Sequence, residues 1–210
     1  YYANGSGAVV TGWLLLGNTW YYLDGTNEKY PGLMLENCKK VIGSATYFFS
    51  ASGAMRTGWI QEPEGWYYAS GSGTMATGWQ WIGGAWYYLD GANETHPGLM
   101  VEDEKKVIGT ATYFFGGNGA MRIGWIDTEE GWYYSDTTSS TGWKYVNGAW
   151  YYLNGANEKY PGLMVADCEM DIGGAIYSFS VSGAMYTGWV QKPEGWYYYN
   201  GIGVKVTGWI

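Results

Sequence analysis

The sequence predicts an all-β fold built from stacked β-hairpins, and three observations lead to this expectation. The pair Gly-Trp recurs along the 210 residues, and in six copies a Trp-Tyr-Tyr run begins seven residues after the first tryptophan. Aromatic residues make up 20% of the chain, and its 35 glycines suit tight turns between short strands. Self-similarity at a fixed period indicates a stack in which each unit contacts only its neighbours.

The repeat has two levels. The pairs that begin at Gly12, Gly78, Gly142 and Gly208 are spaced by 66, 64 and 66 residues. We therefore expect one elongated domain, residues 1–210, with super-repeats at 12–77, 78–141 and 142–207. Each super-repeat holds a regular first unit with a longer tail, a degenerate second unit and a regular third unit. In the degenerate units, the residues expected in place of Gly-Trp are Lys39-Lys40, Lys105-Lys106 and Glu169-Met170, and those in place of the second tryptophan are Tyr47, Tyr113 and Tyr177.

Each unit is predicted to be a β-hairpin. Asn147-Gly148 and Gly83-Gly84 separate short aromatic or aliphatic runs, as two-residue turns with positive φ require. Alternation along a strand places Trp66 and Tyr68 on one face and Tyr67 on the other. A single hairpin is marginally stable in water, so the hairpins must stack. The central tyrosines of the six runs are expected to pack between hairpins: Tyr21, Tyr67, Tyr87, Tyr133, Tyr151 and Tyr197.

The tails of the first units are predicted to be ordered connecting loops. They contain Tyr30-Pro31-Gly32, His96-Pro97-Gly98 and Tyr160-Pro161-Gly162, each followed by Leu-Met. A residue before proline is driven to an extended conformation, and Pro-Gly then turns the chain. His96, the single histidine, corresponds to a tyrosine in the other two copies. We therefore interpret it as a loop residue and not as a general base.

Charge and composition exclude several classes of function. A formal net charge of −8 disfavours nucleic acid and attracts cationic ligands. We expect no membrane insertion, because no apolar run approaches the roughly 20 residues of a spanning helix. We also expect no metal and no cofactor, since His and Cys do not cluster at ligand spacing. Cys38 and Cys168 stand at equivalent positions two copies apart, too distant for a disulfide, and are predicted to be free thiols. The chain begins in mid-repeat and is interpreted as a fragment of a longer protein.

The repeat resembles the choline-binding, or cell-wall-binding, repeat of Gram-positive surface proteins and murein hydrolases. The clearest copy runs from Thr57-Gly58-Trp59 through Trp66-Tyr67-Tyr68 and Gly73-Thr74-Met75 to Thr77-Gly78-Trp79. The resemblance covers nearly the whole chain. It implies a solenoid in which stacked hairpins form a left-handed superhelix, with about three hairpins in each turn.

In that family the ligand lies between consecutive hairpins, held by two indoles of one hairpin, a tyrosine of the next and often a methionine. Carried over residue by residue, the resemblance implies one cage of Trp59, Trp66, Met75 and Tyr88. It implies a second cage of Trp125, Trp132 and Tyr152, without a methionine because the segment 136–140 is shorter. It also implies a half-site of Trp189 and Trp196, whose partner hairpin is cut off after Ile210. Weaker cages with phenylalanine as the third ring are implied at Trp13, Trp20 and Phe49, at Trp79, Trp86 and Phe115, and at Trp143, Trp150 and Phe179. No cage is expected after the degenerate hairpins, where Lys40 or Lys106 would repel a cation.

Aromatic cages suit a quaternary ammonium, which cannot donate a hydrogen bond but is attracted to ring faces. The resemblance therefore implies a non-catalytic attachment module that binds choline or phosphocholine of teichoic or lipoteichoic acid, outside the cell on a bacterial wall. Two alternatives stay open from the residues. Sugar rings stack on the same indoles, which would make the chain a glucan- or other carbohydrate-binding module. The array could also act as a structural spacer that pairs with a second copy as a homodimer.

Overall fold

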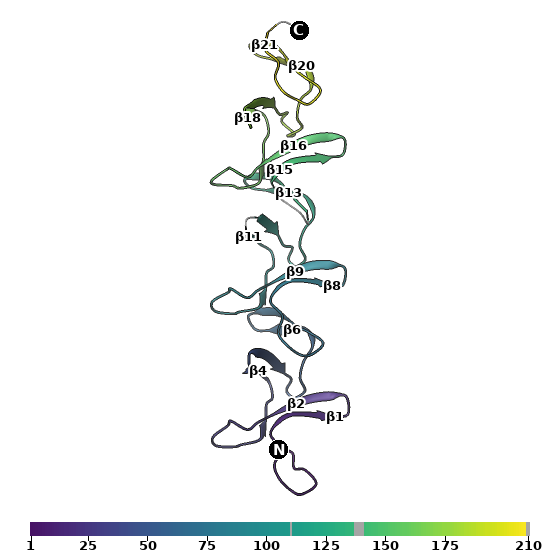
Figure 1. The fold of residues 1–210 in the computed structure, drawn as a ribbon, viewed down its shortest axis with the longest axis vertical. Helices are drawn as coiled ribbons and strands as arrows, with labels where there is room; N and C mark the ends of the chain where they lie inside the picture. Colours follow the sequence, from purple (N-terminus) through teal and green to yellow (C-terminus); the bar gives the residue numbers. More distant parts are fainter. Residues whose placement is uncertain (110, 137–140, 209–210) are drawn as a thin grey trace. The chain divides into compact units, whose positions relative to one another are not determined.

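A computed structural model describes residues 1–109, 111–136 and 141–208, and every regular element in these ranges is a β-strand (Figure 1). Nine two-stranded antiparallel hairpins follow one another within these ranges. Their strands are β1 Gly12–Leu16 and β2 Thr19–Asp24, β4 Cys38–Ile42 and β5 Ala45–Phe49, β6 Gly58–Glu62 and β7 Gly65–Ala69, β8 Gly78–Ile82 and β9 Ala85–Asp90, β11 Lys105–Ile108 and β12 Ala111–Phe114, β13 Gly124–Thr128 and β14 Gly131–Ser135, β15 Gly142–Val146 and β16 Ala149–Asn154, β18 Glu169–Ile172 and β19 Ala175–Ser178, and β20 Gly188–Lys192 and β21 Gly195–Tyr199. The predicted all-β hairpin fold is confirmed.

The hairpin turns follow the local chemistry of the sequence. In β8–β9, Ile82 pairs with Ala85, which leaves Gly83 and Gly84 as a two-residue turn with φ of 59° and 88°. In β15–β16 the turn is Asn147-Gly148, with φ of 50° and 87°. Positive φ at both central residues gives a turn whose twist matches that of the flanking strands. The register of these hairpins is therefore set locally.

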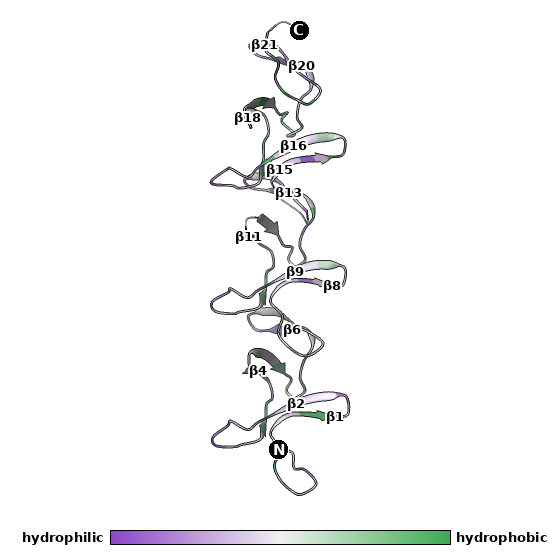
Figure 2. Cartoon of the chain, in the orientation of Figure 1, coloured by the Kyte–Doolittle hydropathy of each residue, from purple (hydrophilic) through white to green (hydrophobic). Residues whose placement is uncertain are grey.

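Short strands in the tails complete the first hairpin of each super-repeat. These strands are β3 Leu33–Met34, β10 Leu99–Met100 and β17 Leu163–Met164, and each adds a third strand to its sheet. Figure 2 shows the tail strands in the hydrophobic colour. In the first hairpin β2 is pale, because Trp and Tyr lie near the middle of the hydropathy scale, whereas β1 with its three leucines is green. The side chain of Leu99 packs against a core cluster that includes Phe48, Ile60 and Tyr67. The tail is thus part of the core as well as a connection.

The hairpins use their two faces differently. In β6–β7, Ile60 is paired with Tyr67, and both side chains are fully buried at 0% exposure. Trp59 pairs with Tyr68 and Gln61 with Trp66, on the opposite face. Burial of an aliphatic side chain such as that of Ile60 contributes about 1.5–3 kcal/mol. Tyr67 and the equivalent Tyr133 therefore lie in the core, as predicted.

The degenerate hairpins are offset by one residue from the predicted alignment. Lys39 pairs with Phe48, as Trp59 pairs with Tyr68, and Cys38 therefore takes the place of Gly58. The residues in place of the first tryptophan are Lys39, Lys105 and Glu169, and those in place of the second are Thr46, Thr112 and Ile176. The assignment of Lys40 and Lys106 to the tryptophan position was wrong, because a two-residue turn, and not a seven-residue step back from Tyr47, fixes the register.

The strands group into two compact units, residues 1–102 with 117–120, and residues 103–116 with 121–210. Each unit is described by itself below. The interpretation as one domain, the super-repeat boundaries and the left-handed superhelix remain predictions. Cys38 and Cys168 are both free thiols, as predicted.

Candidate ligand cages between hairpins

The indole pair of each regular hairpin lies on one face of that hairpin. The ring centroids of Trp59 and Trp66 are 6.4 Å apart with an interplanar angle of 90°. Tyr68, on the same face, lies 5.2 Å from Trp59. Edge-to-face rings at these separations stabilise one another. Both indoles are only partly buried, so the pair forms two walls of an open corner.

The next hairpin supplies a third wall to this corner. The ring of Tyr87 lies 4.8 Å from that of Trp59, with an angle of 67°. Together with Met100, these rings line a cavity of about 300 Å³, which Glu102 also borders. We call Trp59, Trp66, Tyr87 and Met100 the Trp59 cage. The exposed carboxylate of Glu102 and the faces of the rings give the Trp59 cage a negative electrostatic potential.

The second unit contains an equivalent arrangement. Trp143 lies 6.3 Å from Trp150 and 4.8 Å from Tyr177 of the next hairpin. These residues and Met185 line a cavity of about 320 Å³, and we call them the Trp143 cage. The Trp150 side chain is 44% exposed. An indole held in place by its neighbours and open to solvent on one side can receive a ligand without rearrangement.

Two further ring groups repeat this geometry. Trp13 lies 6.2 Å from Trp20 and 4.7 Å from Tyr47. Trp125 lies 4.7 Å from Tyr151, and Trp132 stands where Trp66 stands in β6–β7. The angles between the first indole and the crossing tyrosine in all four groups fall between 64° and 68°. This constancy indicates that the stacking of neighbouring hairpins sets the geometry.

The predicted third rings Tyr88 and Tyr152 are wrong. Tyr88 is the cross-strand partner of Trp79 in its own hairpin, with ring centroids 5.2 Å apart. Tyr152 holds the same position beside Trp143. Because these tyrosines lie on the same face as the indoles of their own hairpin, they cannot reach back to the preceding one. The central tyrosine of the run points the other way and crosses the junction.

The central tyrosines Tyr87 and Tyr151 are therefore cage walls, whereas the sequence predicted them as packing residues. Applied to both faces, strand alternation contained the correct answer. Of the aromatic residues, the two tryptophans and the last tyrosine lie on the first face, and the central tyrosine alone lies on the second face. The missed wall was thus visible in the sequence once each face was assigned to a different neighbour.

The predicted phenylalanines Phe49 and Phe179 do lie beside the first indole of the preceding hairpin, but a tyrosine of the same strand crosses the junction closer to that indole. Phe49 and Phe179 are each only 2% exposed and lie 6.0 Å and 5.9 Å from Trp13 and Trp143. Tyr47 and Tyr177 take the position of the third wall, and Tyr177 lines the cavity beside Trp143. The cages of Trp13 and Trp143 therefore keep a tyrosine as the third ring. Weaker binding was expected there because phenylalanine was predicted at that place, and this reason does not hold. Phe115, which was predicted as the third such wall, is 3% exposed and belongs to the second unit.

The predicted methionine Met75 does not close the Trp59 cage. Its backbone N–H donates to the carbonyl of Thr46, in the hairpin before Trp59, and its side chain packs on the core cluster around Phe48. Because the chain turns back after each hairpin, its methionine reaches the preceding junction. Met100 therefore closes the Trp59 cage. Met164, which pairs with Leu153 as Met100 pairs with Leu89, holds the equivalent position after Trp125.

The remaining predicted residues are the indole pairs of two further hairpins. Trp79 and Trp86 lie 6.2 Å apart within the first unit. Trp189 and Trp196 are 60% and 62% exposed, and Trp189 contacts Tyr198 at 5.2 Å. Trp209 of the last Gly-Trp pair, and residues 137–140, which bear on the predicted missing methionine, lie outside the described residues.

The chemistry of the cages is that of binding. Their walls are rings and a thioether, which attract a cation without transferring a proton. Within the described ranges, no three His, Cys, Asp or Glu residues group as a metal site. His96 lies on the tail with Nδ1 3.7 Å from the Glu64 carboxylate, in keeping with its interpretation as a loop residue. Among the described residues, no helix is long and apolar enough to span a membrane.

Comparison with known proteins identifies relatives of this arrangement. Four stretches, at residues 11–26, 57–75, 77–92 and 141–156, match the family of cell wall binding repeats. The chain is similar to choline binding protein F of Streptococcus pneumoniae, with 24% identity and a TM-score of 0.68 over 96% of this chain and 81% of that chain. The structure of that protein in the presence of a peptidoglycan analogue gives 27% identity and a TM-score of 0.64 over 98% and 83% of the two chains.

The choline-binding domain of CbpL from Streptococcus pneumoniae is also similar. It shares 26% identity with the chain, with a TM-score of 0.67 over 96% of this chain and 100% of that chain. A search of curated proteins found no match.

Proposed function

We propose that the chain is an attachment module that binds choline, free or as phosphocholine of teichoic and lipoteichoic acids; four stretches that match cell wall binding repeats and the likeness to choline-binding proteins support this proposal. The ligand would occupy the cages that begin with Trp13, Trp59, Trp125 and Trp143. The chain would act without catalysis, outside the cell and on a bacterial wall.

One observation carries this proposal. In the Trp59 cage, two perpendicular indoles and a tyrosine of the next hairpin surround an open cavity of about 300 Å³. A trimethylammonium group offers no N–H donor, and it gains attraction from three ring faces at once. The net charge of −8 attracts the same ligand over a longer range.

The energetics favour many weak sites. A cation–π contact contributes about 0.5–2 kcal/mol, so three walls give roughly 2–5 kcal/mol. After association costs, this corresponds to a dissociation constant near ~1 mM for one cage. A polymer that carries many phosphocholines would engage several cages, and linked sites raise the overall affinity without new contacts. Repetition of the cage thus suits attachment to a polymer.

Isothermal titration with choline, followed in parallel by tryptophan fluorescence and thermal melting, tests the proposal. We expect quenching or a shift of the indole emission and a melting midpoint that rises with choline concentration, because the ligand binds only the folded chain. The matched control is 3,3-dimethylbutanol, a neutral analogue in which a carbon replaces the ammonium nitrogen. Equal binding of the two ligands would refute recognition of charge, and the absence of choline binding would leave the spacer or homodimer interpretation.

A second candidate function, carbohydrate binding, is favoured by two exposed rings outside the cages. Trp81 is 59% exposed and lies 5.3 Å from Trp86, and Tyr145 is 61% exposed and lies 5.2 Å from Trp150. The third hairpins carry polar residues at this position, namely Gln61, Asp127 and Gln191. Paired exposed rings offer a flat platform on which a sugar ring can stack.

The variants Trp81→Ala and Trp59→Ala separate the two candidates. If glycans are bound on the exposed platform, Trp81→Ala lowers the affinity for glucan or cell-wall oligosaccharides and leaves choline binding unchanged. Trp59→Ala removes one choline equivalent and leaves the platform intact. If both variants bind glycans as well as the parent does, this platform is not the glycan site.

A further inference from the structure

The junction after the first degenerate hairpin already contains a cation. Lys39 replaces the first indole, and its Nζ lies 4.4 Å from the ring centroid of Tyr67 and 3.2 Å from its Oη. Tyr67 holds the same place in its hairpin as the cage tyrosine Tyr87. The ammonium of the chain itself therefore lies on the ring that would receive a ligand in a cage.

A carboxylate completes this group. Lys39 Nζ donates to Glu64 Oε1 at 3.5 Å, and Tyr67 Oη donates to the same oxygen at 2.8 Å. The hydrogen bond from Tyr67 is the main cause that lowers the pKa of Glu64, and burial followed by that bond raises the pKa of Tyr67. His96 Nδ1, from the following tail, lies 3.7 Å from the carboxylate. The lowered pKa favours the ionised form of the Glu64 carboxylate.

The second copy repeats the group with the same signs of charge. Lys105 Nζ lies 5.0 Å from the ring centroid of Tyr133 and 5.7 Å from that of Tyr160. It donates to Glu130 Oε1 at 3.3 Å. Tyr160 is the tail residue that corresponds to His96. In both copies the tail therefore brings a side chain to the group, beside the carboxylate in the first copy and beside the ammonium in the second.

The third copy keeps the group but exchanges the charges. Glu169 replaces the first indole, and the ammonium comes from Lys205, which stands where Met75 and Met185 stand after their hairpins. Lys205 Nζ lies 4.1 Å from the ring centroid of Tyr197 and 2.9 Å from Glu169 Oε2. Lys192 also donates to Glu169, at 2.8 Å.

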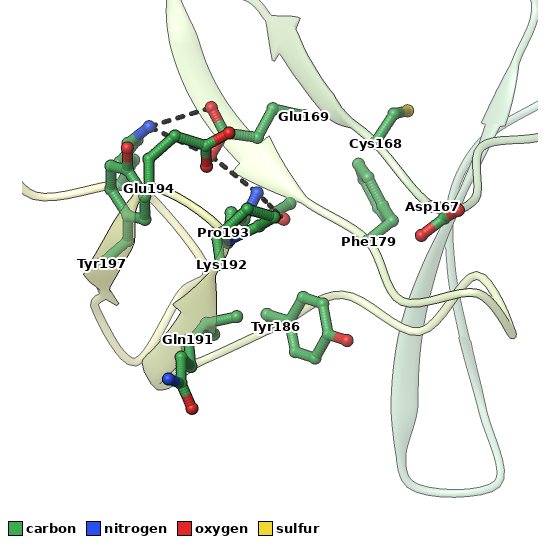
Figure 3. Close-up of a pocket in the computed structure, with 13 residues that line it drawn as sticks. Asp167, Cys168, Glu169, Phe179, Tyr186, Gln191, Lys192, Pro193, Glu194 and Tyr197 are labelled. Atoms are coloured by element: carbon green, nitrogen blue, oxygen red, sulfur yellow. Dashed lines mark hydrogen bonds and ion pairs between the residues drawn. The ribbon is translucent and has the colours of Figure 1, made fainter.

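Figure 3 shows Glu169, Lys192 and Tyr197 around the cavity of this junction, which measures about 480 Å³. The charges are exchanged between chain positions, but an ammonium still rests on the equivalent tyrosine. What is retained in all three copies is therefore the ammonium on the ring and its carboxylate.

We propose that the junctions after the degenerate hairpins are primary-ammonium sites that lysines of the chain occupy permanently. The groups of Lys39, Lys105 and Lys205 each combine a ring face with a carboxylate acceptor. A primary ammonium has three N–H donors. A carboxylate accepts from the ammonium in each group, and the Tyr67 hydroxyl is a second acceptor in the first group. A quaternary ammonium has none, so these junctions would select against choline. The inference stands whether or not the cages bind choline.

Chemical rescue tests the proposal. In Lys39→Ala the lost atoms correspond to propylammonium, while the ring of Tyr67 and the carboxylate of Glu64 remain. We expect the melting midpoint of this variant to fall by a few degrees and propylammonium chloride to restore at least half of the loss. Choline chloride at equal ionic strength can raise the midpoints of variant and parent alike through the cages, so it should leave the difference between them unchanged. Lys39→Met fills the same space without charge, so its midpoint should fall without rescue.

Equal stabilisation of Lys39→Ala, Lys39→Met and the parent chain by propylammonium would overturn the proposal, as would a choline solution that closes the gap between Lys39→Ala and the parent as far as propylammonium does. If Lys39→Ala does not fold, Lys205→Ala gives the same test in the third copy, with Glu169 and Tyr197 as the remaining partners. Failure of choline to bind the parent chain would affect the proposed function alone.

Discussion

The junction after β6–β7 and the junction after β4–β5 occupy equivalent places between hairpins, yet rings line the first and charges line the second. Trp59 and Trp66 at the first become Lys39 and Thr46 at the second. The crossing tyrosine is common to both, and it is half-buried as Tyr87 but fully buried as Tyr67. Two substitutions thus convert an open cage into a closed ion pair on a ring.

This difference has consequences for stability without ligand. An aromatic junction leaves indole surface exposed, as at Trp150, and a ligand would cover it. An ionic junction supplies its own cation and needs no ligand. Each unit therefore contains both junctions that are open to a ligand and junctions that hold neighbouring hairpins together by their own contacts. The predictions below test this division, in order of decreasing effect.

Trp143→Ala should have the largest effect, because this indole contacts Trp150, Tyr152 and Tyr177 at once. We expect the affinity of that cage for choline to fall at least tenfold, so that titration counts one fewer bound choline. Tyr145→Ala, which removes the exposed ring of the same strand, is the control and should keep the full count. An unchanged count in Trp143→Ala would show that this cavity is not a choline site.

The double variant Lys39→Trp, Thr46→Trp should convert an ionic junction into a cage. It removes the internal ammonium from Tyr67 and adds the two missing walls, so titration should count one additional choline. The single variant Lys39→Trp provides one indole only and should bind more weakly. If the double variant melts cooperatively but binds no additional choline, the two positions alone do not distinguish the junctions.

The ionic junction of the third copy should be sensitive to acid. Burial disfavours the charged form of Glu169, but hydrogen bonds from Lys192, Tyr199 and Lys205 outweigh it and lower its pKa from 4.5 to about 2. A lowered folded-state pKa contributes stability above pH 4.5 that is lost as the pH falls from 4.5 to 2. The melting midpoint of Glu169→Gln should therefore lie below that of the parent at pH 6, and the difference should shrink toward pH 2. A constant difference would contradict this coupling.

Glu102→Gln should have the smallest effect. This carboxylate borders the Trp59 cage but is exposed, so water and salt screen its attraction for a cation. We expect the affinity of that cage for choline to fall about twofold in dilute buffer. The same titration in ~1 M salt should show no difference between variant and parent, whereas a difference that persists would indicate direct contact with the ligand.

The sequence predicted the elements well because their causes are local. Asn147-Gly148 and Gly83-Gly84 specify their turns, and aromatic alternation specifies the strands. The indole pairs followed from the fixed offset between Trp59 and Trp66. The degenerate hairpins were misaligned by one residue because Lys39 and Thr46 leave no aromatic marker, and only pairing with the opposite strand fixes their register.

The sequence by itself determined a repeat of hairpins with two indoles on one face, since turn chemistry and strand alternation act over a few residues. Only the tertiary structure decided which residues meet across a junction. Tyr87 joins Trp59, Met100 closes the cavity and Lys39 reaches Glu64, 25 residues away. These contacts depend on how one hairpin packs on the next and on where the chain returns between them, and neither is encoded in the periodicity of a single hairpin.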